Sequence, residues 1–433
     1  MDCFVGIDLG STTTKSIIMD ENKRVIGRGI TNSRSSYHVA CQVAREEAEI
    51  NTRFFLLQDI IRRSIPSVAL ADELMEWLTA KFALAQHRKQ LVALERESHT
   101  VIGLSDKMGA DKSTYENVIG SIFKEIHTLS EGLFLPGGRA KSDFFRDIAT
   151  GLFLKQAELV AKDQGLSFDR LIGIFDKAIL RVENSSFAIY FDEYMEFAGQ
   201  EVVKIAKFST YKNAIISAVK DIIALKLNIV ASVGTGYGRL TLPFPKEQIR
   251  SEILCHGLGA HYLFPMTRTV LDIGGQDTKA IQVDEHGIVT SFQMNDRCAA
   301  GCGRYLGYIA DEMNMGLHQL GPLAMQSTKH VKINSTCTVF AGAELRERLA
   351  LGENREDILA GLHRAIVLRA MSILARSGGI FSEFTFTGGV AKNEAAVSAL
   401  KKLVQENYGE VKMNISADSI YTGAIGASLF AHI

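Results

Sequence analysis

The stretch "NDRCAAGCGRYLGYIADEM", residues 295–313, contains the residue types that point most directly to chemistry. It places Cys298 and Cys302 among alanine and glycine, where a polar loop changes into a helical pattern. A thiolate at the N-terminus of a helix is stabilised by the helix dipole, which lowers the pKa of the thiol and favours a net-negative group. A cysteine with a function in this segment is therefore a metal ligand or a reactive thiol.

The remaining cysteines do not form a disulfide framework, because the six in the chain have no regular spacing. Cys3, Cys41 and Cys255 are expected to be small buried apolar side chains. Two interpretations remain open for Cys302, one helical turn after Cys298: it faces the same site, or it packs in the interior. A zinc site is disfavoured, because "CAAGC" has no second close pair of ligands.

Composition excludes several classes of protein. The chain has 433 residues, of which 46% are hydrophobic and 22% are charged, so it can bury the cores of two or three domains. Its net charge of −1 provides no attraction for nucleic acid or an anionic membrane. We see no apolar run near the roughly 20 residues that span a bilayer, and the start "MDCFVGIDLG" lacks the pattern of a signal peptide. We expect a cytoplasmic protein that binds neither nucleic acid nor membrane.

An internal repeat indicates how the chain is organised. "IDLGSTTTKSI" near the N-terminus and "LDIGGQDTKAI" later in the chain align without gaps, each after a short β-rich run. The matched pairs, each 264 residues apart, are Asp8 with Asp272, Gly10 with Gly274, Thr14 with Thr278, and Lys15 with Lys279. Both copies predict a strand, a glycine turn, a strand, a turn and a strand. The period is too long for a solenoid, so we expect a duplicated α/β domain with a ligand site between the copies.

Glycine-rich segments suit a nucleotide. In both repeats an acid ends a strand and glycine follows, so that backbone N–H groups can approach phosphate oxygens while the carboxylate holds Mg²⁺ directly or through water. In "FTFTGGVAKN", Gly388 and Gly389 would let the backbone lie against a planar ring or a ribose, before a helix expected to begin at Asn393. "TGAIGA" (422–427) fits either a close helix crossing or a nucleotide contact.

Four segments of the chain resemble motifs of the actin, hexokinase and Hsp70-like ATPase superfamily. In order, the phosphate 1, phosphate 2, adenosine and connecting motifs resemble "GIDLGSTTTK", "DIGGQDTK", "TGGVAKN" and "TGAIGA". The resemblance implies an α/β fold of duplicated ribonuclease-H-like domains with Mg²⁺ and ATP between them. The catalytic residues that it implies are Asp8 and Asp272, near the metal or the attacking water, and Gln276, beside the phosphates. The nucleotide-binding residues that it implies are Gly10, Ser11, Thr12, Thr13, Lys15, Gly274, Gly275, Glu344, Gly388, Gly389 and Asn393.

Further motifs narrow the resemblance. Four more segments resemble those of ATP-dependent activators of 2-hydroxyacyl-CoA dehydratases and of the ATPase subunits of ATP-dependent benzoyl-CoA reductases. They are "VGTGYGR" (233–239), "SEILCHGLGA" (251–260), "MNDRCAAGCGRYL" (294–306) and "NSTCTVFAGAEL" (334–345). The similarity covers residues 1–34 and about 209–433.

The narrower resemblance implies that Cys298 and Cys337 bind iron and sulfur. Two thiolates do not complete the four-thiolate shell of an iron–sulfur cluster. We therefore predict one [4Fe-4S] cluster that bridges two subunits.

A long insertion distinguishes the chain from the shorter activators. Residues 35–208 show apolar residues at helical spacing, which predicts a mostly helical segment. The expected domains are a first ATPase half (1–34 and 209–265), the insertion (35–208) and a second ATPase half (266–433) that carries the cluster cysteines. The larger ATPase subunit of benzoyl-CoA reductases resembles the whole length, so the insertion favours that subunit.

The expected function is ATP-dependent electron transfer. Domain closure on ATP hydrolysis would change the exposure of the cluster, and with it the reduction potential. Electrons would pass from ferredoxin to benzoyl-CoA for reductive dearomatisation. The implied partners are a smaller related ATPase subunit that shares the cluster, and catalytic subunits that bind the acyl-CoA.

Three alternatives stay open. The first is a homodimeric activator of a 2-hydroxyacyl-CoA dehydratase. The second is a small-molecule kinase of the same fold, which needs no cluster, and the third is a chaperone-like or filament-forming ATPase. His256 and His261 are expected to be ordinary helix residues.

Overall fold

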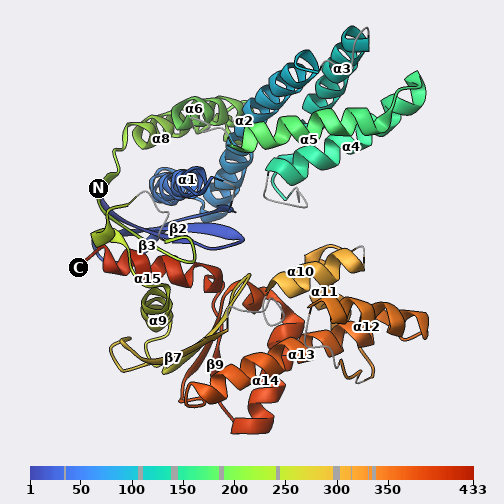
Figure 1. The fold of residues 1–433 in the computed structure, drawn as a ribbon. Coiled ribbons are helices and arrows are strands. Elements are labelled where there is room, and N and C mark those ends of the chain that lie inside the picture. Colours follow the sequence, from blue (N-terminus) through green and yellow to red (C-terminus); the bar gives the residue numbers. More distant parts are fainter. Residues whose placement is uncertain are drawn as a thin grey trace. The chain divides into compact units, whose positions relative to one another are not determined.

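The computed structural model divides into two compact units, described separately below (Figure 1). The first unit comprises Met1–Ser33, Ala40–Ala48 and Asn228–Ile433, and the second comprises Arg34–Val39 and Glu49–Leu227. The residues described are 1–33, 36–105, 111–137, 145–184, 190–239, 244–295, 303–313, 315–329, 331–333 and 338–433.

The first sheet of unit 1 has the strand order β3-β2-β1-β4. Its strands are β1 (Asp2–Leu9), β2 (Thr13–Asp20), β3 (Val25–Asn32) and β4 (Asn228–Thr235). Strand β1 pairs antiparallel with β2 and parallel with β4. Its last five residues are all buried, as expected for a central strand that is covered on both faces.

The second sheet repeats the same hairpins, with the strand order β7-β6-β5-β8-β9. Its strands are β5 (Thr269–Ile273), β6 (Thr278–Val283), β7 (Val289–Asn295), β8 (Phe384–Thr387) and β9 (Met413–Asn414). Strand β5 pairs antiparallel with β6 and parallel with β8, as β1 does with β2 and β4. The duplicated strand–turn–strand–turn–strand pattern predicted from the sequence is confirmed.

Two glycine-bearing helices, α9 (Glu252–Leu263) and α15 (Thr422–Phe430), cross at very short range. A Cβ atom on Gly426 would lie 1.9 Å from the carbonyl oxygen of Cys255, and one on Gly259 would lie 2.0 Å from that of Thr422. Helix α15 also lies against β1, where a Cβ on Gly6 would lie 2.0 Å from the carbonyl oxygen of Ala424. The close helix crossing that the spacing of "TGAIGA" allowed is therefore present.

Five further helices of unit 1 share a core with the second sheet. They are α10 (Gly303–Glu312), α11 (Leu317–Ala324), α12 (Thr338–Ala350), α13 (Arg355–Arg376) and α14 (Glu394–Tyr408). Helix α13 is the one helix of the described residues that is long and apolar enough to cross a membrane, although the sequence was expected to contain no such run. Its buried side chains share a core with Leu271 of β5 and Phe384 of β8, so it packs as a core helix.

Unit 2 is helical, which confirms the mostly helical character expected for the insertion. The helices of the segment are α1 (Tyr37–Ser64), α2 (Val68–Gly103), α3 (Lys112–Ser130), α4 (Phe145–Gln164), α5 (Phe168–Asn184), α6 (Phe191–Val202), α7 (Ala206–Ser209) and α8 (Lys212–Ala224). Ser67 caps α2 by accepting a hydrogen bond from the N–H of Leu70. Helix α2 contributes to two separate cores, one shared with α6 and α8 and one with α3, α4 and α5.

Short 3-10 helices complete the described structure. They are η2 (Glu131–Leu133), η4 (Lys246–Gln248), η5 (Gly389–Lys392) and η6 (Ser419–Tyr421).

Candidate nucleotide site and cysteine segment

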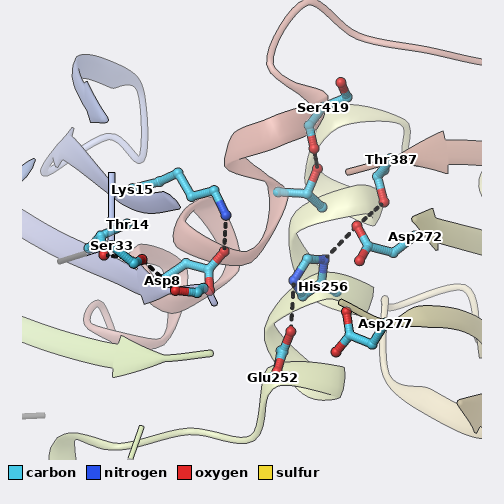
Figure 2. A network of polar contacts seen from close by, with 12 residues as sticks. Asp8, Thr14, Lys15, Ser33, Glu252, His256, Asp272, Asp277, Thr387 and Ser419 are labelled. Atoms are coloured by element: carbon cyan, nitrogen blue, oxygen red, sulfur yellow. Dashed lines mark hydrogen bonds and ion pairs between the residues drawn. The ribbon is translucent and has the colours of Figure 1, made fainter. Parts of the chain in front are cut away.

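Asp8 lies at the end of β1, next to the first glycine turn. It is the register partner of Lys15 on β2, and the Nζ atom of Lys15 lies 3.3 Å from its Oδ2 atom (Figure 2). The Oδ1 atom of Asp8 is buried and has no hydrogen-bond partner among the residues that the structure describes. Next to it is Gly236, at φ +102°, where a Cβ would lie 2.5 Å from this oxygen. Asp8 therefore keeps one carboxylate oxygen available for a ligand.

Ser33 fixes the backbone of the first turn. Its hydroxyl donates a hydrogen bond to the carbonyl of Gly10 and lies 3.0 Å from the hydroxyl of Thr14, while its N–H donates to the carbonyl of Thr12 at 2.8 Å. These bonds tie the turn to the end of β3. They hold the loop that carries Ser11, Thr12 and Thr13 in one conformation, as a phosphate-binding loop requires.

Asp272, the counterpart of Asp8 at the end of β5, is surrounded by donors and cations. Its Oδ1 accepts a hydrogen bond from Thr387 at 2.9 Å and lies 3.2 Å from Nδ1 of His256 (Figure 2). Its Oδ2 lies 3.3 Å from Nζ of Lys279, its register partner on β6. Burial alone would raise the pKa of Asp272, but His256 and Lys279 outweigh burial and hold this pKa well below its usual range. Asp272 is therefore ionised and already paired on both oxygens.

Lys279 is a fully buried lysine, with 1% of its surface exposed. Besides Asp272, its ammonium group lies 2.9 Å from Glu252 of α9 and 2.8 Å from Asp277. Burial would lower the pKa of Lys279, but the carboxylates raise it well above its usual value. Its repeat counterpart Lys15 has one carboxylate partner and a side chain that is 12% exposed. Of the two lysines, Lys15 is the less enclosed.

The two glycine turns meet each other. A Cβ on Gly275 would lie 2.4 Å from Oγ1 of Thr12 and 3.6 Å from Oγ of Ser11. A Cβ on Gly274 would lie 2.9 Å from Oδ1 of Asp277, whose carbonyl also accepts the N–H of Gly274 at 2.9 Å. The structure thus brings Ser11 and Thr12 of the first turn next to Gly275 of the second, and glycine at 275 allows this close approach.

The third glycine segment lies against the second turn. Gly388, at φ +87°, donates its N–H to the carbonyl of Ser419 at 3.1 Å, and a Cβ there would lie 2.3 Å from the carbonyl oxygen of Ile273. Around Gly389, by contrast, no atom of the described structure lies within 4 Å of the position of a Cβ. Gly389 is therefore the residue of this pair whose backbone a nucleoside can approach.

Three other residues were predicted to bind the nucleotide or to act in catalysis: Asn393, Glu344 and Gln276. Asn393 caps α14, with its side-chain oxygen accepting the N–H of Ala396 at 3.1 Å. Glu344 of α12 is bound by Arg348, whose Nη2 atom lies 3.0 Å from its Oε1. Gln276 lies half-buried in the second turn. Their predicted contacts with the nucleotide stay predictions.

The predicted cluster ligands Cys298 and Cys337, together with Cys302, lie outside the described residues. Cys3, Cys41 and Cys255 are buried, as expected. Within the described part of the chain, no group of three or more His, Cys, Asp or Glu side chains is arranged to hold a metal ion.

The residues that flank the cysteine segment contact the second glycine turn and the strand that follows it. Before it, Asn295, the last residue of β7, is the register partner of Thr278 on β6. After it, the first two residues of α10, Gly303 and Arg304, donate their N–H groups to the carbonyls of Gly274 and Gly275, each at 2.8 Å. The described residues on either side of segment 296–302 are therefore joined to this turn and to the strand that follows it.

Sequence reasoning missed two charged residues of the site. His256, expected to be an ordinary helix residue, is 6% exposed and lies beside Asp272. Lys279 matches Lys15 in the repeat, but the sequence indicated no role of its own for it. The four-residue spacing of Glu252 and His256 on one helix was the available signal, because it places both side chains on the same face.

Comparisons with known proteins agree with this arrangement. The profile of the BadF/BadG/BcrA/BcrD ATPase family matches residues 5–431. The activating ATPase of (R)-2-hydroxyglutaryl-CoA dehydratase from Acidaminococcus fermentans is 42% identical over 207 residues, 48% of this chain and 77% of that protein. A benzoyl-CoA reductase subunit from Thauera aromatica is 34% identical over 207 residues, 48% of this chain and 72% of that protein.

A solved structure has the same fold. It is the activator of the 2-hydroxyisocaproyl-CoA dehydratase from Clostridium difficile with bound ADPNP, which superimposes with a TM-score of 0.55 at 20% identity. The match covers 99% of this chain and 94% of that chain. The duplicated actin, hexokinase and Hsp70-like ATPase fold expected from the sequence is thereby confirmed.

Proposed function

Since the chain belongs to the BadF/BadG/BcrA/BcrD ATPase family, we propose that it is the ATP-hydrolysing subunit of an electron-transfer system. In this proposal it receives electrons from a ferredoxin and passes them on through a [4Fe-4S] cluster that it shares with a second, related ATPase subunit. The observation that carries the proposal is the pair of hydrogen bonds from Gly303 and Arg304 to the carbonyls of Gly274 and Gly275. They join the phosphate-binding turn to the segment that contains Cys298.

The residues of the nucleotide site fit Mg²⁺ and ATP. Asp8 has a buried carboxylate oxygen without a partner among the described residues, which is the type of ligand that Mg²⁺ prefers. Glycine at positions 10, 274 and 275 allows close approach in these turns, as a backbone that donates N–H groups to phosphate oxygens requires. Lys15 adds a positive charge near Asp8, and Gly389 leaves space for the nucleoside.

The cluster would be held by Cys298 and Cys337 of this chain and by two equivalent thiolates of the second subunit. When bound, an iron–sulfur cluster supplies one-electron transfer at a potential set by its exposure and by hydrogen bonds to its sulfurs. The role of the chain is to move segment 296–302. Because this segment leaves β7 opposite Thr278 and enters α10 on the carbonyls of Gly274 and Gly275, it follows the turn that would touch the phosphates.

We propose benzoyl-CoA as the final acceptor. In this proposal the insertion, residues 35–208, docks the catalytic subunits that bind the aromatic CoA thioester, while the ATPase halves comprise 1–34 with 209–265, and 266–433. The similarity to the benzoyl-CoA reductase subunit from Thauera aromatica supports this choice. The second candidate is a 2-hydroxyacyl-CoA dehydratase, and it is supported by the greater identity to the activating ATPase from Acidaminococcus fermentans. A small-molecule kinase would have no use for the attached cysteine segment.

Anaerobic purification tests the proposal. We expect brown protein that contains about four irons per pair of ATPase subunits, given the four-thiolate shell of such a cluster. Cys298→Ala and Cys337→Ala should each lose the iron and still bind ATP. Cys41→Ala, at a buried position, is the matched control and should keep the iron. Iron at wild-type content in both ligand variants would refute the assignment.

The acceptor is tested separately with the complete complex. Co-purification with a smaller ATPase subunit, and ATP turnover that depends on benzoyl-CoA, would support the reductase. A stable homodimer that activates a 2-hydroxyacyl-CoA dehydratase would support the second candidate and exclude the first.

A further inference from the structure

His256 of α9 lies in the candidate nucleotide site, although it was expected to be an ordinary helix residue. In Figure 2 it lies between the aspartates of the two glycine turns, with Asp272 on one side and Asp8 on the other. Its Nδ1 atom lies 3.2 Å from Oδ1 of Asp272, and its Nε2 atom lies 3.9 Å from Oε1 of Glu252. The ring is buried, so these carboxylates form its polar environment without competition from water.

The other side of His256 faces Asp8 across Gly423, the second residue of α15. A Cβ on Gly423 would lie 2.8 Å from Nε2 of His256 and 3.0 Å from Oδ2 of Asp8. The same small space is therefore bordered by the imidazole from α9 and by the carboxylate from β1. Only glycine leaves this space open, and Thr422, which precedes it, is fully buried.

Each of the two residues that border this space has one buried polar atom, on its other side, that is incompletely satisfied. Within the described residues, Nδ1 of His256 makes no hydrogen bond of good geometry despite its short distance to Asp272, and Oδ1 of Asp8 has no partner. A buried polar group without a good partner costs free energy, so each such group calls for an explanation.

We propose that His256 is a positioning residue for ATP hydrolysis, which fixes the carboxylate of Asp272 opposite Asp8. Asp272 is held at Oδ2 by Lys279 and at Oδ1 by Thr387, and the imidazole of His256 lies 3.2 Å from the same Oδ1. Removal of the imidazole therefore leaves one side of the carboxylate less constrained. This inference rests on the ATPase part of the proposed function. It does not depend on the cluster or on the acceptor.

Substitutions that move the side-chain nitrogen test the proposal. His256→Asn retains a nitrogen at the δ position, toward Asp272, whereas His256→Gln places it at the ε position, toward Glu252 and Asp8. We expect His256→Ala and His256→Gln to lower kcat for ATP by about 10- to 100-fold, as loss of a partner that orients a ligand residue does elsewhere. The Kd for ATP should change little, and His256→Asn should recover most of the loss.

His261→Asn on the same helix is the matched control, and it should keep the kcat of the wild-type protein. The comparison of Asn with Gln keeps the proposal testable if His256→Ala does not fold, because both variants carry an amide. Equal kcat values for the Asn and Gln variants, or a wild-type kcat for His256→Ala, would overturn the positioning role. ATP turnover is measured without an acceptor, and the iron content is measured separately. If the protein contains no iron and still shows these differences in kcat, only the electron-transfer proposal fails.

Discussion

Asp8 and Asp272 occupy the same register position in two repeated hairpins, each facing a lysine on the next strand. Their surroundings have diverged. Asp272 is paired on both oxygens, whereas Asp8 has one buried oxygen without a partner among the described residues. The duplication thus produced one carboxylate that is free to bind a ligand and one that is already fixed by the protein.

Because of this difference, replacement of each aspartate by asparagine should change stability and ATP turnover to different extents. Asp272→Asn leaves the buried charges of His256 and Lys279 without their shared partner, so we expect a loss of about 3 kcal/mol in the free energy of unfolding. Asp8→Asn should cost less stability and should abolish ATP turnover, because the free carboxylate oxygen is lost. Urea unfolding of the nucleotide-free protein, together with an ATPase assay, measures both effects. A larger loss of stability in Asp8→Asn than in Asp272→Asn would contradict this division of roles.

The crossing of α9 and α15 predicts strong sensitivity to a single methyl group. In Gly426→Ala the Cβ would lie 1.9 Å from the carbonyl oxygen of Cys255, so the two helices must separate. We expect a loss of about 1–3 kcal/mol or more in the free energy of unfolding. Gly307→Ala in α10 is the control: no atom of the described structure lies within 4 Å of its Cβ, and alanine favours helix by up to about 1 kcal/mol. Equal stability of the two variants would be inconsistent with the close crossing.

The buried thiols predict selective reactivity. Burial raises the pKa of Cys41 to about 12, with a smaller contribution from the charge of Asp8, and burial likewise raises the pKa of Cys255 to about 12. At pH 8 only about one in ten thousand of these groups is a thiolate, the form that reacts. Iodoacetamide should therefore leave both unmodified in the native protein and alkylate both in urea, as read by peptide mass spectrometry. Comparable labelling rates in the two conditions would show that these thiols are accessible.

His87 predicts acid sensitivity of the insertion. It is buried in α2 against the rings of Phe134 and Phe145, and burial, assisted by His127, lowers its pKa to about 4. The unfolded chain binds this proton near pH 6.5 and the folded chain does not, so stability is lost as the pH falls from 6.5 towards 4.

At pH 5 this group should cost about 2 kcal/mol. His87→Phe should remove that part of the pH dependence in urea unfolding of the insertion helices, while His99→Gln on the same helix should retain it. An unchanged pH dependence in His87→Phe would disprove the buried neutral imidazole.

The hairpins, the glycine turns and the helical insertion were predictable, because each depends on local patterns. Asp, Gly and Lys recur at the same spacing in both copies, and the burial of β1 and β5 follows from their apolar residues. The position of His256 beside Asp272 was only partly predictable. Its spacing from Glu252 places both side chains on one face of α9, but the contact depends on how α9 packs in the fold. The same holds for the burial of Lys279, which needs Glu252 from a helix 27 residues earlier in the chain.

The central claim is that the phosphate-binding turn moves the cysteine segment, and Gly303 gives the most direct test. Gly303→Pro removes the N–H that donates to Gly274 at the first position of α10, where proline is tolerated, while Gly303→Ala keeps it. The measurement is the electron paramagnetic resonance spectrum and midpoint potential of the cluster with ADP and with a non-hydrolysable ATP analogue. We expect a nucleotide-dependent change in the wild-type protein and in Gly303→Ala, and little or none in Gly303→Pro. A spectrum and midpoint potential that do not change with the nucleotide in the wild-type protein would contradict the claim. So would a full nucleotide-dependent change in the proline variant.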